Sequence, residues 1–160
     1  QTRRQELADN RIEEERRVML REEVRRHNVQ LVDAAKGAGV IEPIDYAIFQ
    51  NHGYMGLYGG LNQMDIHKRK GLKKSQKILD HMGSTELAAN LFRATQAEEK
   101  LRRDNVRWKD AANRTHHDVG VKVRQTIREL GGTMPEELPV AESIKKIEAK
   151  QRKKLGEVSK

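Results

Sequence analysis

The sequence predicts an all-α fold in which a long N-terminal helical arm precedes a compact helical bundle. Apolar residues recur at three- and four-residue steps through most of the 160 residues, the spacing of one helix face. No stretch shows the sustained alternation typical of strands. Hydrophobic residues make up 36% of the chain and aromatic residues 4%, so the expected core is thin and aliphatic.

Residues 1–36 are expected to form the arm. Strong helix formers dominate residues 2–36, and Gly37 and Gly39 end the pattern. A helix of that size is about 50 Å long, whereas a globule of 160 residues has a radius of gyration near ~15 Å. A ragged apolar stripe runs along it: Ala8, Ile12, Met19, Val24, Leu31 and Ala35. We therefore expect the helix to project or to pack on another chain, giving a homodimer or higher oligomer through residues 2–36.

Residues 37–140 are expected to form the helical core domain. Pro43 suits a first helical turn, which predicts a short helix over 43–50 before the glycine-rich stretch 53–60. Helical patterns follow at 61–70 and 74–82, with a break at Gly71. Four of the six aromatic residues lie within 46–58, and they suit either a small core or stacking on nucleic-acid bases: Tyr46, Phe49, Tyr54 and Tyr58. The core interpretation is favoured, because the surrounding segment is slightly acidic.

Two longer helices and a short one complete the predicted order. Ser84 suits an N-cap for a helix reaching about Arg103, and Asp104 or Asn105 suits the cap of the next, which ends before Gly131. One face of this second helix is expected to be apolar and consists of Ala112, His116, Val119, Val123, Ile127 and Leu130. Pro135 and Pro139 bracket a loop. Residues 141–160 are expected to form a C-terminal helix with a fraying basic tail.

Composition excludes several classes of protein. There is no cysteine, which excludes a disulfide scaffold and a cysteine zinc site. No apolar run approaches the ~18–20 residues that a membrane span needs, and the first 30 residues lack the apolar region of a signal peptide. A soluble cytoplasmic protein is the default. Because the chain begins at Gln1, we expect a fragment or a processed product.

Positive charge is concentrated in the middle of the chain. The net charge is +8, and residues 61–131 hold 16 basic and 9 acidic residues, a net of +7. Such a run is often only a solvated surface, but lysine and arginine also neutralise phosphates and release counterions. We predict a surface for nucleic acid or an acidic partner, made of Lys68, Arg69, Lys70, Lys73, Lys74, Lys77, Arg102, Arg103 and Arg124.

Catalytic, metal and cofactor sites are not indicated. His116 and His117 are adjacent, so on a helix they point about 100° apart. His116 lies on an apolar face, which favours a hydrogen-bonded core residue over a metal ligand. The glycines of 53–60 match neither a Walker A loop nor a dinucleotide fingerprint. We expect no enzyme, no metal and no cofactor.

Two stretches resemble the DNA-damage-inducible protein D (DinD) family. They are AIFQNHGYMGLYGGLNQMDIHKRKGLKKSQKILDHMGSTELAANLFRATQAEEKLRRD and VGVKVRQTIRELGGTMPEELP, within a resemblance from about Arg26 to Ile147. In that family a module similar to the N-terminal domain of BRO-type antirepressors typically precedes this part, and we expect it to be absent here. The resemblance implies a bacterial SOS-response protein, nucleoid-associated in the cytoplasm, that inhibits the recombinase RecA on single-stranded DNA filaments. It supplies no catalytic or ligand residues.

Three functions stay open at this point. The first is a non-enzymatic regulator that engages a RecA–single-stranded DNA filament, or DNA directly, through the basic surface. The second is a prophage antirepressor-like module that binds only protein, with the positive charge steering encounter with an acidic surface. The third is a nuclease, which would need a cluster of carboxylates or histidines around a divalent metal.

Overall fold

Helices make up the architecture of the computed structural model, which describes residues 2–158. In chain order they are α1 (Arg3–Lys36), α2 (Pro43–Leu57), α3 (Gln63–Arg69), the 3₁₀ helix η1 (Ile78–His81), α4 (Ser84–Arg103), α5 (Lys109–Glu129), the 3₁₀ helix η2 (Pro135–Glu137) and α6 (Ile144–Val158). No strand occurs within 2–158, which confirms the all-α class. Gln1, Ser159 and Lys160, the last two at the end of the expected fraying tail, lie outside the described residues.

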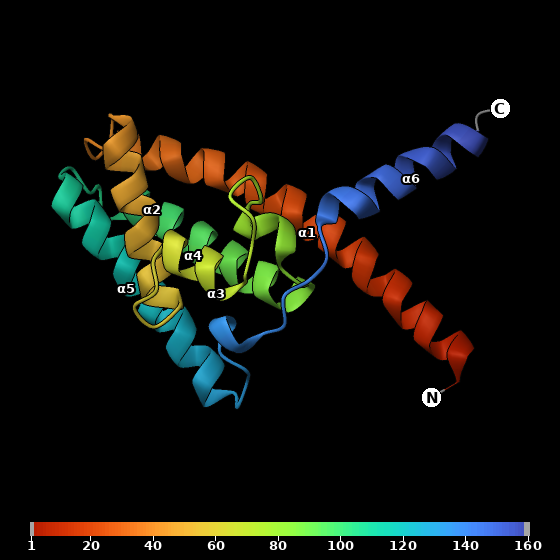
Figure 1. The fold of residues 1–160 in the computed structure, drawn as a ribbon. Coiled ribbons are helices and arrows are strands. Elements are labelled where there is room, and N and C mark those ends of the chain that lie inside the picture. The colour runs from red at the N-terminus through yellow and green to blue at the C-terminus, as the bar shows by residue number, and fades with distance from the viewer. Residues whose placement is uncertain (1, 159–160) are drawn as a thin grey trace.

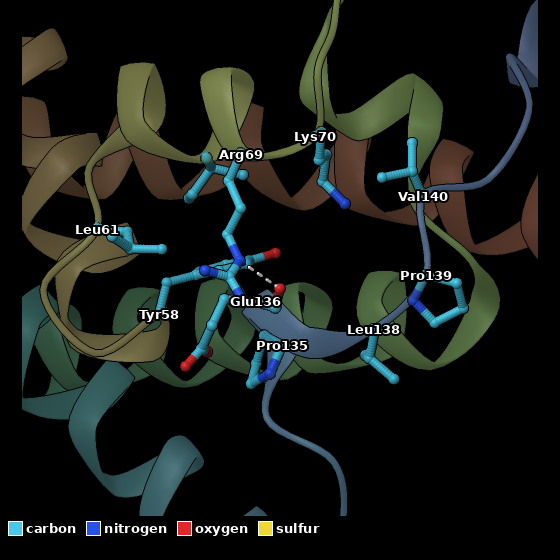
Figure 2. A pocket seen from close by; sticks show the side chains of 10 residues that line it. Tyr58, Leu61, Arg69, Lys70, Pro135, Glu136, Leu138, Pro139 and Val140 are labelled. Atoms are coloured by element: carbon cyan, nitrogen blue, oxygen red, sulfur yellow. Dashed lines mark hydrogen bonds between the residues drawn. The ribbon is translucent and has the colours of Figure 1, made fainter.

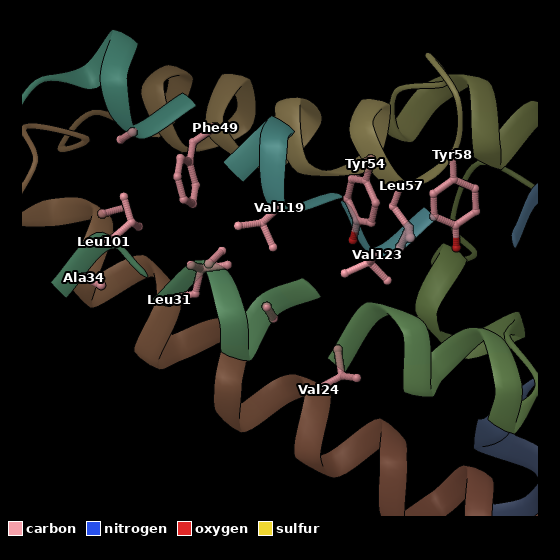
Figure 3. Close-up of a cluster of buried hydrophobic side chains, with 14 of the residues drawn as sticks. Val24, Leu31, Ala34, Phe49, Tyr54, Leu57, Tyr58, Leu101, Val119 and Val123 are labelled. Carbon is pink, nitrogen blue, oxygen red and sulfur yellow. The ribbon is translucent and has the colours of Figure 1, made fainter. Parts of the chain in front are cut away.

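α4 lies at the centre of the bundle, between α1 and α5 (Figure 1). α2 packs along α5 on the other side. Figure 3 shows Val24 and Leu31 of α1 facing a layer that includes Phe49 of α2 and Val119 of α5. Phe49, Tyr54 and Tyr58 are buried, so the core interpretation of the aromatic residues is confirmed.

α1 belongs partly to the bundle and partly to an arm. Its second half contributes Val24, Leu31 and Ala35 to the core, each fully buried, whereas Leu7 and Ile12 in the first half are exposed. The first half of α1 and α6 diverge from the body in different directions (Figure 1). α1 therefore joins the core through its second half, whereas Leu7 and Ile12 in its first half do not contribute to the core.

Glycine allows α2 to approach α5 closely. A Cβ atom at Gly120 would lie 2.7 Å from the carbonyl oxygen of Gly53 and 2.8 Å from the nitrogen of Leu57. A Cβ at Gly53 would overlap the ring of His116. α2 therefore continues to Leu57, and the predicted end of this helix at residue 50 is wrong. Gly53 and Gly56 lie inside a helix because contact with α5 outweighs their low helix propensity.

Three other predicted boundaries differ in the structure. Residues 74–82 form a loop followed by η1, not a helix. The N-cap of α4 is Gly83, because the backbone N–H and hydroxyl of Ser84 both donate to Glu13 of α1. α5 begins at Lys109 rather than after Asp104 or Asn105, and Leu130 beyond its end is 81% exposed.

Arg17 joins three separate stretches of chain. Its Nε donates to the carbonyl oxygen of Met82 (2.9 Å), and its Nη2 donates to those of Asp80 (3.2 Å) and Glu142 (2.7 Å). The neighbouring Arg21 pairs with the Asp80 carboxylate at 3.0 Å. α1 thereby holds η1 and the start of α6 in place. We call residues 132–143, which run from α5 to α6, the strap.

Candidate functional site

The predicted basic run lies at the end of α3 and in the loop that leads to η1. Asn62 and Asp65 form a capping box that starts α3, and Gly71, with φ of 68°, turns the chain after it ends. The ring of His67 donates from Nε2 to the carbonyl oxygens of Lys73 (2.9 Å) and Gln76 (3.0 Å). The loop is therefore folded around one histidine of α3.

Four lysines of this run remain available to a ligand. They are Lys68, Lys73, Lys74 and Lys77, which we call the basic segment. All four are exposed, and within residues 2–158 their side chains make no hydrogen bond or ion pair. The two acids that flank this run in the sequence are engaged elsewhere, since Asp65 caps α3 and Asp80 pairs with Arg21. The basic segment is therefore a local excess of four uncompensated positive charges.

Arg69 and Lys70 point away from the basic segment, toward a cavity under the strap (Figure 2). The Lys70 side chain is only 6% exposed, and its Nζ lies 2.8 Å from Oε1 of Glu86. Arg69 donates from Nε to the carbonyl oxygen of Glu136 at 2.7 Å. These two cations are thus separated from the other four, although all six are close in the sequence.

Arg124 is engaged in a bidentate ion pair. Its two terminal nitrogens lie 2.7 and 2.9 Å from the carboxylate of Glu136, and it also donates to the carbonyl oxygen of Leu57. The hydrogen bond to Glu136 raises the pKa of Arg124. Burial acts to raise the pKa of Glu136, but its hydrogen bonds and the positive charges of Arg124 and Arg69 together outweigh burial, so the pKa is lowered. Arg124 therefore fixes the strap to α5.

Arg102 and Arg103 lie at the opposite end of α4 from its start near Glu13. Arg102 contacts Asp33 (3.4 Å) and the carbonyl oxygen of Gln30 near the end of α1. Arg103 pairs with Glu99 at 2.6 Å. Asp80, next to the basic segment, pairs instead with Arg21, which is nine residues or about 14 Å before Gln30 along the helix. The structure thus divides the predicted residues into three groups rather than one continuous surface.

α6 adds exposed cations that the sequence reasoning described only as a basic tail. Lys145 and Lys146 are exposed at the start of α6 and are free of ion pairs within the described part of the chain. This end of α6 lies beside η1, because Ala141 N–H donates to the carbonyl oxygen of His81. The available signal was the run from 145 to 154, which has six cations and one acid. These lysines extend positive charge outward from the end of the basic segment.

A chain of hydrogen bonds crosses the core behind Lys70. Tyr58 donates to Glu86 and accepts from Asn90, and Asn90 in turn accepts from Arg93. Burial raises the pKa of Glu86, against the opposing effect of Lys70. Burial also raises the pKa of Tyr58 well above its usual value. These hydrogen bonds join the end of α2, the end of α3 and the first half of α4.

Arg93 and His116 end this network in the most buried part of the molecule. Both are 0% exposed. The Arg93 Nη1 donates to Nε2 of His116 (2.5 Å), whose Nδ1 donates to the carbonyl oxygen of Phe49 (2.8 Å). Burial and the Arg93 charge lower the pKa of His116 well below its usual value, so the ring is neutral. The prediction that His116 is a hydrogen-bonded core residue is confirmed.

Among residues 2–158, no group of three histidine or acidic side chains is close enough together to hold a metal ion. Within the same residues, no helix combines the length and the hydropathy needed to cross a bilayer.

The fold and the site together define a class: an all-helical protein with an uncompensated lysine segment beside a cavity. Residues 12–147 match the family described as the DinD C-terminal domain. The chain is 69% identical, over 154 residues, to DNA damage-inducible protein D of Escherichia coli (strain K12), covering 92% of this chain and 56% of that protein. No solved structure matches. The chain therefore belongs to the DinD C-terminal domain family, and it spans little more than half the length of the curated relative.

Proposed function

We propose that this chain acts in the bacterial response to DNA damage as a non-enzymatic regulator that inhibits RecA on single-stranded DNA filaments. The family membership and the name of the E. coli relative support a role in DNA damage. One observation about the molecule supports contact with the filament: the four lysines of the basic segment are exposed and unpaired. Their role would be to neutralise phosphates of the DNA within the filament.

A salt titration of binding to single-stranded oligothymidine tests the DNA contact. If all four lysines meet phosphates, the log–log slope of affinity against salt contains a contribution of about −3. Changing all four to glutamine should remove most of that slope. The matched control changes four exposed cations of the arm: Arg3, Arg4, Arg11 and Arg16. Equal loss in both variants, or a flat dependence for the unchanged protein, rejects contact through the basic segment.

RecA inhibition has a separate test. RecA-catalysed ATP hydrolysis on single-stranded DNA should fall when the protein is added, and should recover with the four-glutamine variant. Inhibition by that variant at the same concentration as the unchanged protein would contradict a role for the basic segment. No effect of the unchanged protein would contradict inhibition by this part of the family's sequence.

A prophage antirepressor-like module that binds only protein is the second candidate. It is favoured by the exposed apolar side chains on one face of α2 and just before it, since Ile41, Ile44 and Ile48 are 58%, 65% and 43% exposed. Capture of RecA after nuclease digestion would favour this candidate over DNA contact. Loss of capture on digestion would favour the first.

Self-association through α1 is also proposed, over a smaller surface than the sequence indicated. Val24, Leu31 and Ala35 are used within the chain, and exposed apolar positions remain at Leu7, Ile12 and Met19. Sedimentation should show a dimer or larger species that dissociates when Leu7 and Ile12 become glutamate. A monomer at all concentrations would contradict this.

A further inference from the structure

A cavity of about 290 Å³ lies between the end of α2, the end of α3 and the strap (Figure 2). Leu61 and Ile66 form apolar wall on one side, and Leu138 and Val140 of the strap form it on the other. The volume is at the small end of the ~300–1,000 Å³ typical of ligand sites. It suits one or two amino-acid side chains.

Lys70 lines this cavity and is almost completely buried. Its side chain is 94% buried, since 6% is exposed, and its ammonium donates to Glu86 alone among the described residues. A lysine ammonium has three hydrogens to donate. Glu86 is in turn held by Tyr58, which Asn90 fixes from behind. Burying a charged group is costly unless it is paired, so this network keeps the ammonium in one position with donor capacity left.

Arg69 supplies a second cation to the same cavity. Its Nε donates a hydrogen bond to the carbonyl oxygen of Glu136, and its two terminal nitrogens make no hydrogen bond within residues 2–158. The Glu136 carboxylate is already occupied by Arg124. Three cations at or beside the cavity, Arg69, Lys70 and Arg124, therefore face the two carboxylates of Glu86 and Glu136, which leaves an excess of one positive charge when both carboxylates are ionised.

We propose that this cavity binds the carboxylate of an acidic residue in a protein partner, with an aliphatic neighbour of that residue against Leu138 and Val140. The apolar walls match an aliphatic side chain and not a sugar–phosphate backbone. The ring of Tyr58 is 1% exposed, so no aromatic face is offered for a base to stack on. An arginine and a lysine together can make charge-assisted hydrogen bonds to one carboxylate.

The cavity is separate from the basic segment, so this proposal does not depend on the function proposed above. Its test contains neither DNA nor RecA. The probe is the capped tripeptide acetyl-Leu-Asp-Leu-amide, titrated into the ¹⁵N-labelled full chain and followed by NMR. Acetyl-Leu-Asn-Leu-amide is the matched neutral probe, and inorganic phosphate is the competing anion.

The aspartyl peptide should shift the amide signals of residues 69, 70 and 136–140 saturably. The asparaginyl peptide and phosphate should each bind at least about tenfold more weakly. Arg69→Gln should weaken the aspartyl peptide about tenfold, as should Val140→Trp, which fills the cavity without touching either cation. Lys74→Gln, in the exposed loop, should change nothing.

Three results would overturn the assignment. One is the absence of saturable shifts in the strap. Another is equal binding of the aspartyl and asparaginyl peptides. The third is phosphate binding as tightly as the aspartyl peptide, which would assign the cavity to phosphate instead. Arg69→Gln is preferred to a change at Lys70, because removing Lys70 would leave the buried Glu86 without its partner and could unfold the chain.

Discussion

Arg93 and the lysines of the basic segment have no ion pair within residues 2–158, and they differ in what surrounds them. Arg93 is fully buried between Asn90, His116 and the ring of Tyr54, which lies 5.0 Å from its guanidinium carbon. The lysines of the basic segment are exposed to water. In the first region, hydrogen bonds and a ring stabilise the charge; in the second, water does. An unpaired cation is therefore a stability element or a binding element according to its burial.

The sharpest way to break this comparison is to remove the buried cation. Arg93→Ala leaves a cavity and deprives His116 and Asn90 of their hydrogen-bond donor. We expect the free energy of unfolding to fall by about 3–5 kcal/mol. Urea denaturation measures it. Arg102→Ala, an arginine on the surface of the same helix, should change it by less than about 1 kcal/mol. Similar losses in both variants would mean that Arg93 has no special role.

The second test concerns the glycine contact that brings His116 close to α2. Gly120→Ala places a Cβ 2.7 Å from the Gly53 carbonyl oxygen, so the helices must separate. The expected loss is about 1–3 kcal/mol of unfolding free energy. Gly156→Ala is the matched control, because nothing lies within 4 Å of a Cβ there. In that exposed helix alanine should stabilise by roughly 0.5–1 kcal/mol at most.

The third test uses pH. The pKa of His116 is lowered in the folded protein, so below the unfolded value of about 6.5 the unfolded state binds the extra proton. Stability from the neutral ring is therefore complete above pH 6.5 or so and is lost as the pH falls, by up to about 1.4 kcal/mol per unit. His116→Gln lacks this titration. As the pH falls from about 7.5 to 5, the free energy of unfolding should therefore decrease more for the unchanged protein than for His116→Gln.

The smallest effect is expected in the basic segment. Changing Lys68, Lys73, Lys74 and Lys77 to glutamine removes four exposed side chains without structural partners. The free energy of unfolding should change by no more than about 0.5 kcal/mol per site, while the salt dependence of oligothymidine binding changes strongly. A large loss of stability would show that these lysines have a structural role. Weaker binding by this variant would then not be evidence of direct contact.

Periodicity predicted the parts of the fold that follow from local pattern. α1, α4 and α5 lie close to where three- and four-residue spacing placed them, and the face of α5 from Ala112 to Val123 is buried as expected. The pattern predicted the wrong structure where contacts between residues far apart in the sequence determine the local conformation. α2 continues through Gly53 because α5 packs against it, and residues 74–77 form a loop held by His67.

The candidate site was only partly accessible to sequence reasoning. Counting charge identified the stretch of chain that contains the basic segment. It could not separate Lys68 from Lys70, two residues away, because one side chain meets water and the other meets Glu86. Nor could it show that Arg93 is fully buried while Arg102, on the same helix, is exposed. Burial depends on which helix packs over a residue, and nothing in the local sequence states that.

The cavity under the strap depends on α1 through Arg17, although α1 does not line the cavity. The strap wall of the cavity is positioned by Glu136 at one end and, at the other, by the bond from Arg17 to the carbonyl oxygen of Glu142. The same guanidinium holds the chain at Asp80 and Met82. Any force or partner that bends α1 at this point would loosen three anchors at once and change the width of a pocket on another part of the surface.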